Sequence, residues 1–465
     1  MPRSVSKLVG LAALLQAALL ALPLGAQQPE TPPPPGPPRD FAVPVPHELT
    51  LANGMHVTLV PYGTVPLAVV SLAVRTGPID EGPHQVWISR LMGNYLSEGT
   101  TSRSAAAIAR TAAGMGGALS VNVGNQMAIF GTVLADSAAS FVQLIADVAR
   151  HPSFPESAFV RLRTDALRTL AIDRTEPGQL ARERFAADIY GDHPYGRLLP
   201  SADDLQGYTT AEIRDFYAGH VGAARAHLYV VGRFDPAAVE QAVRSAFGDW
   251  AAGSAPATNI PSPRAERTVT LVDRPGAVQS TIELGLPVPD PTNPDWVALD
   301  VTDALLGGSF GSRITSNIRE QKGYTYSPRS VVDPRYRSAT WAEQADVTTA
   351  VTGASLKEIF AEIDRLRREP PSADELRGIQ NYLAGVFVLR AATENGLLNQ
   401  LQFVDFHGMG PDYLTQYVHR VYAVTPADVE RIAQQYLDPA KMAIVVVGDK
   451  KVVSDQVAPY GKIVQ

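Results

Sequence analysis

The chain has 465 residues, no cysteine, 45% hydrophobic residues, and 40 Lys+Arg against 47 Asp+Glu. This composition is typical of a folded protein of two or three domains, and a net charge of -7 provides no basic field that would favour binding to nucleic acid. The absence of cysteine excludes disulfides, thiolate catalysis and cysteine-ligated zinc, so any metal would need His and carboxylate ligands.

The first 26 residues have the pattern of a secretory signal peptide. A basic start precedes an apolar stretch from Leu8 to Leu22, and small residues lead to Ala26. Residues 27–46 are rich in proline and predict a stiff, extended linker. We therefore expect an exported protein of the bacterial periplasm, with membrane association only if the signal peptide remains uncleaved.

The globular part mixes helical and strand periodicities in its first half. Apolar spacing and turn residues predict, in chain order, a helix over Ser104–Ala113, a strand over Met127–Ala135, helices over Ser137–Ala149, Ala158–Ile172 and Thr210–Ala218, and a strand over His227–Val231. Ser137 and Thr210 are the expected helix caps. Because strands and helices do not alternate regularly, the pattern favours an α+β fold over a doubly wound parallel sheet.

The sequence also repeats itself. Thr209 to Ile213 (TTAEI) is similar to Thr425 to Val429 (TPADV), and the two segments are 216 residues apart (425 minus 209). Val230-Val231-Gly232 recurs as Val446-Val447-Gly448 at the same offset. Such a register predicts a duplicated unit. We expect two homologous domains, residues 47–254 and 267–457, joined by a proline-containing linker over 255–266.

Several short motifs follow one another in a set order: Asn53 to Val57, Leu96 to Thr100, His193 to Gly196, Val230 to Gly232, Leu306 to Arg313 and Arg319 to Ser327. Together with the duplication, this ordered set resembles the insulinase, or pitrilysin-type (M16), metallopeptidase family over nearly all of the mature chain. The resemblance implies two α+β domains, each a mostly antiparallel sheet with helices packed on one side. It further implies closure with a second such unit around a peptide.

The zinc motif of that family, H-x-x-E-H, does not survive in this chain. Alignment on Gly99 places Arg90, Gly93 and Asn94 at the positions of the first His, the Glu and the second His, and residues 168–170 at the position of the remote Glu ligand. The guanidinium of Arg90 is always protonated and would repel zinc. No two of the nine histidines are three or four residues apart, so a substitute helical pair is not available. We therefore expect no metal on this chain.

The resemblance gives Arg319 and Tyr326 a role. An Arg and a Tyr at this spacing face the zinc across the closed cavity of the family, where they donate hydrogen bonds to the substrate backbone and to the developing oxyanion. Tyr324 is a competing phenol, because strand alternation would put it on the same face as Tyr326. From spacing alone, Arg319 would be a surface charge beside Glu320, and Tyr326 a packed strand residue.

One short pattern is shared with serine hydrolases. Gly307 to Gly311 matches G-x-S-x-G around Ser309, but that motif requires a preceding strand, and the apolar spacing of residues 296–306 predicts a helix. We therefore do not expect Ser309 to be a catalytic nucleophile.

We therefore expect a zinc-less subunit of a heterodimeric insulinase-family peptidase that acts on peptides. Arg319, Tyr326 and, as an alternative, Tyr324 would contact the substrate, and the zinc would lie on the partner subunit. The alternatives are a structural or peptide-binding scaffold without a role in proteolysis, and a peptidase with unusual zinc ligands.

Overall fold

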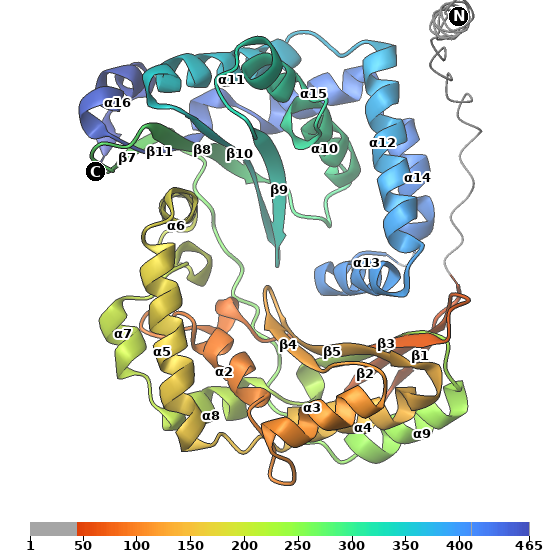
Figure 1. Cartoon of the computed structure of the whole chain (residues 1–465). Helices are drawn as coiled ribbons and strands as arrows, with labels where there is room; N and C mark the ends of the chain where they lie inside the picture. Colours follow the sequence, from red (N-terminus) through yellow and green to blue (C-terminus); the bar gives the residue numbers. More distant parts are fainter. Residues whose placement is uncertain (1–43, 411, 465) are drawn as a thin grey trace, which may run out of the picture. The chain divides into compact units, whose positions relative to one another are not determined.

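The computed structural model describes residues 44–410 and 412–464. The predicted signal peptide and almost all of the predicted linker that follows it lie outside these residues. The described residues form two six-stranded sheets, one from each half of the chain (Figure 1). Within this part of the chain, none of the helices combines the length and the apolar character needed to cross a bilayer.

The first sheet has the strand order β1-β2-β6-β3-β5-β4. Its strands are β1 (His47–Thr50), β2 (His56–Pro61), β3 (Leu67–Val74), β4 (Ser120–Val123), β5 (Met127–Leu134) and β6 (Ala226–Gly232). All of its pairings are antiparallel except that between β2 and β6. The central strand β3 is buried on both faces, which explains why its sequence is almost wholly apolar.

Helices of the first half follow the strands in three groups, after β3, after β5 and after β6. They are α2 (Ile88–Leu96), α3 (Ala105–Gly114), α4 (Ala138–Arg150), α5 (Glu156–Asp173), α6 (Pro177–Tyr190), α7 (Ala202–Gly207), α8 (Thr210–His220) and α9 (Pro236–Phe247). Helices α4 and α9 lie together along one face of the sheet (Figure 1). Burial of their apolar stripes against the sheet forms the first hydrophobic core.

The second sheet has the order β12-β7-β11-β8-β10-β9. Its strands are β7 (Thr268–Asp273), β8 (Gln279–Val288), β9 (Arg329–Arg335), β10 (Ser338–Thr348), β11 (Ala443–Gly448) and β12 (Ile463–Val464). The helices are α10 (Trp296–Asp303), α11 (Thr352–Leu366), α12 (Ala373–Ala391), α13 (Glu394–His407), α14 (Tyr413–Ala423), α15 (Pro426–Tyr436) and α16 (Lys450–Val457). Two π-helical segments, Ala304–Gly308 and Thr315–Gln321, connect α10 to the segment before β9.

The two halves share one topology. The order β2-β6-β3-β5-β4 of the first sheet corresponds to β7-β11-β8-β10-β9 of the second, and the capping boxes of α8 and α15 are built identically by Thr209 with Glu212 and by Thr425 with Asp428. The prediction of an α+β fold with two homologous, mostly antiparallel domains is confirmed. The outermost strands β1 and β12 differ, because β1 runs antiparallel and β12 parallel to its neighbour.

Each half also covers the sheet of the other half. Helix α6 of the first half packs its apolar side against β11 and β8, and α13 of the second half packs Leu397 and Leu398 against β2, β3 and β6. Polar contacts accompany the second interface: the Tyr229 hydroxyl donates to Asp405 at 2.8 Å, and His227 Nδ1 lies 3.2 Å from the same carboxylate. Each sheet is therefore covered on one face by helices of its own half and on the other face by a helix of the other half.

The predicted elements of the first half agree with the structure to within about two residues at most ends. The predicted caps do not. The Ser137 side chain makes no capping hydrogen bond, and Thr209 rather than Thr210 caps α8 by accepting from the Glu212 backbone N–H. Thr210 is already the first helical residue, where its hydroxyl cannot reach the orphan N–H groups of the first turn.

Candidate functional site

Helix α2 carries the three positions that align with the zinc motif of the family. The Glu81 carboxylate accepts hydrogen bonds from the backbone N–H groups of Trp87 and Ser89, both at 3.1 Å, and so fixes the start of the helix. Trp87 itself has a left-handed backbone, with φ of 73°. Burial raises the pKa of Glu81 to about 7, although the hydrogen bonds from Ser89 and Trp87 oppose the rise.

The structure places Arg90, Gly93 and Asn94 on α2 without any arrangement for a metal. Arg90 is exposed, and its guanidinium carbon lies 4.5 Å from the centre of the Trp87 ring. Gly93 is buried under β4, where an added Cβ would lie 2.5 Å from Val123 Cγ2. A Glu at position 93 would therefore require the Val123 side chain of β4 to move. Asn94 is exposed.

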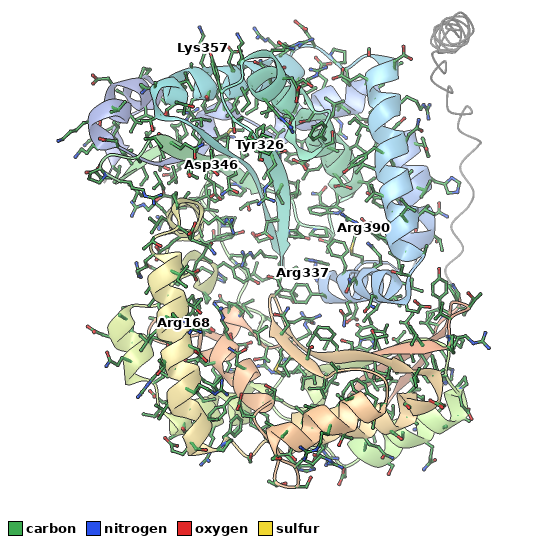
Figure 2. All side chains as sticks on the ribbon, in the orientation of Figure 1. Arg168, Tyr326, Arg337, Asp346, Lys357 and Arg390 are labelled. Atoms are coloured by element: carbon green, nitrogen blue, oxygen red, sulfur yellow. The ribbon has the colours of Figure 1, made fainter. Side chains whose placement is uncertain are left out.

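The position of the expected remote ligand is also without a carboxylate. Arg168 lies on α5 with its side chain exposed and forms an ion pair with Asp165 at 3.0 Å (Figure 2). Over residues 44–410 and 412–464, no three His, Asp or Glu side chains converge as a metal site would require.

Arg319 and Tyr326 are brought together in the second half. The guanidinium carbon of Arg319 lies 4.9 Å from the centre of the Tyr326 ring and 4.5 Å from the centre of the Phe310 ring. Both distances are within the range of cation–π contacts. Arg319 Nε lies 3.2 Å from Glu320 Oε1. The guanidinium thus contacts two aromatic rings.

The two rings of this aromatic–arginine cluster are unusually open to solvent. Tyr326 is 80% exposed and Phe310 is 73% exposed, whereas the Arg319 side chain is 22% exposed. Large apolar side chains that remain exposed next to one another are typical of interaction surfaces. The π-helical turn that holds Arg319, Thr315–Gln321, is of a kind found frequently at functional sites.

Tyr324 lies differently from the sequence expectation. The segment before β9 is not a regular strand: Thr325 forms one isolated bridge, to Val347, so the alternation that would put Tyr324 and Tyr326 on one face does not apply. Tyr324 is half-buried, and its backbone N–H donates to the carbonyl of Ile318 at 2.8 Å. Of the two phenols, Tyr326 is the one whose ring contacts Arg319.

Phe310 was not among the predicted site residues, although its segment, Leu306 to Arg313, is one of the motifs of the family resemblance and also matches a nucleophile elbow. Helix α10 and a π-helical segment precede Ser309 instead of a strand, so the elbow geometry is not formed. Gly307 serves close packing, because an added Cβ would lie 2.5 Å from Ser330 Oγ and 2.6 Å from Glu343 Oε2. An aromatic residue between small residues was the available signal for Phe310.

Comparisons with known proteins cover most of the chain. The model of the insulinase family (peptidase family M16) matches residues 58–202, and that of the peptidase M16 inactive domain matches residues 208–383. An uncharacterized zinc protease of Streptomyces coelicolor is 24% identical over 83% of this chain and 86% of that protein. One of Mycobacterium tuberculosis is 26% identical over 73% of this chain and 77% of that protein.

Two crystal structures have the same fold. The peptidase M16 inactive domain from Pseudomonas fluorescens superposes with a TM-score of 0.81 at 23% identity, covering 87% of this chain and 98% of that one. A protease from Helicobacter pylori superposes with a TM-score of 0.82 at 19% identity, covering 88% of this chain and 100% of that one. With its two matched domains, its duplicated topology and the ordered motifs, this chain belongs to the insulinase (M16) peptidase family.

Proposed function

We propose that this chain is the zinc-less subunit of a periplasmic insulinase-family peptidase, and that it supplies Arg319 and Tyr326 to a composite site with a partner subunit. The main support is the contrast between the two halves. The helix that would carry the zinc motif has Arg90, Gly93 and Asn94 in its place, while the second half has an arginine in contact with two exposed aromatic rings.

The chemistry of the two retained side chains suits peptide cleavage. Zinc on the partner would supply the activated water. Arg319 presents a planar set of N–H donors, and its contacts with the Phe310 and Tyr326 rings limit its rotation. Donors held in advance at the place where negative charge develops stabilise a tetrahedral oxyanion more than flexible donors do. The Tyr326 hydroxyl, 80% exposed with its ring, would add a second donor.

Peptide substrates would bind by strand addition. Strand β9 is the outermost strand of the second sheet and follows Tyr326 after two residues. An extended peptide would pair with its outer backbone groups before Pro334, whose carbonyl already accepts from Asn125 Nδ2 at 3.0 Å. This mode reads the main chain and would direct a peptide along β9 toward Arg319.

The test is reconstitution with an insulinase-family chain from the same genome that has an intact H-x-x-E-H motif. We expect the mixture to cleave an unfolded peptide much faster than either chain alone. Arg319→Ala should lower kcat/KM of the mixture by about 100-fold, the usual cost of losing one oxyanion donor. Arg377→Ala is the matched control, because Arg377 also lies over an aromatic ring, that of Tyr422 at 5.3 Å, and should have no effect.

Other outcomes would contradict the proposal. Normal cleavage and normal assembly by the Arg319→Ala/Tyr326→Phe double variant would make the chain a scaffold only. Stoichiometric zinc and chelator-sensitive proteolysis in the isolated chain would make it a peptidase with unusual ligands.

A further inference from the structure

The second half contains a cavity of about 500 Å3 whose walls come from α10, β9, α12, α13 and α14. All of its lining residues belong to the second half, so it is built by one domain. Its volume lies in the range of small-molecule sites. Arg319, Tyr326 and Phe310 do not line it, so this cavity is distinct from the site proposed above.

Two carboxylates on α10 line one side of the cavity. Asp300 and Asp303 are one helical turn apart. Asp303 is 8% exposed, and its Oδ1 atom accepts both of its hydrogen bonds, from Ser330 Oγ at 2.5 Å and from Trp341 Nε1 at 2.7 Å. Among the described residues, nothing donates to Asp303 Oδ2. This oxygen is therefore free to accept a hydrogen bond from a ligand in the cavity that Asp303 lines.

Aromatic side chains also line the cavity. The rings of Phe387 and Tyr417 stack with centroids 4.5 Å apart, the Tyr413 and Tyr417 rings are 5.9 Å apart, and the Phe403 and Tyr413 rings are 6.4 Å apart. The Tyr417 hydroxyl donates to Asp300 Oδ2 at 2.5 Å, which ties the wall to the acidic side. A carboxylate pair beside aromatic rings favours an organic ammonium group over a bare metal ion.

The cavity that contains the carboxylates of Asp300 and Asp303 is also lined by a cation, the guanidinium of Arg390. Arg390 of α12 is exposed, and within the described part of the chain it forms no ion pair. Figure 2 shows it on the side of α12 that faces β9. Burial raises the pKa of Asp300, and the charge of Arg390 opposes part of that rise. The two groups are therefore near enough to interact, yet the guanidinium remains available to an external carboxylate.

We propose that this cavity binds a zwitterionic amino acid with an aromatic or large aliphatic side chain. Its ammonium group would lie between Asp300 and Asp303, its carboxylate against Arg390, and its side chain on the Phe387–Tyr417 wall. The inference rests on the charges and rings of the second half alone and is independent of the role of Arg319. Because the cavity accepts both termini of a single residue, it discriminates a free amino acid from the interior of a peptide.

The test is isothermal titration of the full chain with L-phenylalanine. We expect saturable binding with one site. N-acetyl-L-phenylalanine, which lacks the ammonium group, and phenethylamine, which lacks the carboxylate, should each bind about tenfold more weakly or worse, because each loses one charged contact. Absence of saturation with L-phenylalanine would overturn the proposal, and equal binding of phenethylamine would overturn the part assigned to Arg390.

Two variants locate the site. Asp303→Asn keeps an oxygen to accept from Ser330 and Trp341 and removes the free carboxylate oxygen, and it should weaken L-phenylalanine binding about tenfold. Arg390→Gln should do the same, and as an exposed position it tests the proposal even if Asp303→Asn does not fold. Asp215→Asn and Arg168→Gln, both on the exposed surface of the first half, are the matched controls. Unchanged affinity in both Asp303→Asn and Arg390→Gln would refute the assignment.

Discussion

Glu283 gives the sharpest prediction for stability. This residue of β8 is 6% exposed, it faces the side of the second sheet that α6 covers, and its Oε2 atom has no hydrogen-bond donor within the described residues. Burial raises the pKa of Glu283 from 4.5 to about 7, against the opposing charges of Arg182 and Arg329. The folded protein therefore holds this proton more tightly than the unfolded chain does.

The sign of the effect follows from linkage. A carboxyl with a raised folded pKa contributes stability that is complete below pH 4.5 and is lost as the pH rises through about 7. A rise of this size corresponds to about 3 kcal/mol of unfolding free energy between pH 4.5 and pH 8.5. Glu283→Gln removes the titrating group, so the variant should gain about 3 kcal/mol relative to the parent over that interval.

The measurement is urea denaturation of the parent and of Glu283→Gln at pH 4.5 and at pH 8.5, with tryptophan fluorescence as the signal. Glu266→Gln, at an exposed position, is the control and should show the same difference from the parent at both pH values. If the difference between Glu283→Gln and the parent does not change with pH, the reasoning from burial is wrong.

Three further predictions concern packing and the aromatic–arginine cluster. Leu397 lies in the fully buried contact of α13 with the first sheet, and Leu397→Ala should lower the free energy of unfolding by about 2–5 kcal/mol in urea denaturation. The control Leu389→Ala, at a position of α12 that is 73% exposed, should change this free energy by less than about 0.5 kcal/mol. Equal effects of the two substitutions would contradict the described packing. Gly93→Ala should destabilise by about 1–3 kcal/mol through overpacking against β4, and an unchanged melting temperature would show that β4 yields freely. In the reconstituted peptidase, Phe310→Leu should lower kcat/KM about threefold, because it removes one of the two cation–π contacts of Arg319. Phe310→Trp keeps an aromatic ring and should retain the parent kcat/KM. A low kcat/KM of Phe310→Trp would argue against a cation–π role for Phe310.

The two-domain architecture could be predicted from the sequence, but the packing of the domains against each other could not. The 216-residue offset between the α8 and α15 capping boxes reflects a real structural repeat, because a duplicated fold needs the same caps at the same places. The reciprocal packing of α6 and α13 could not be predicted, because amphipathic spacing identifies an apolar face but not the sheet that it meets.

The candidate site shows the same limit. The pairing of Arg319 with Tyr326 was implied by family resemblance and is present in space, whereas Phe310 escaped attention because cation–π contacts have no fixed sequence spacing. The alternation argument for Tyr324 was wrong, because a single bridge at Thr325 does not impose the period of a strand. The cavity beside α10 depends on residues from five elements, and no linear pattern brings those together.

The exchange of α6 and α13 makes each repeat depend on the other. A gene cut within residues 255–266 would yield two fragments, each with one bare sheet face of buried strands: β11 and β8 in one, β2, β3 and β6 in the other. Each fragment should aggregate and fold poorly when it is expressed alone, and the two should recover the native structure when they are expressed together. Each repeat made alone would therefore lack the helix that covers one face of its sheet.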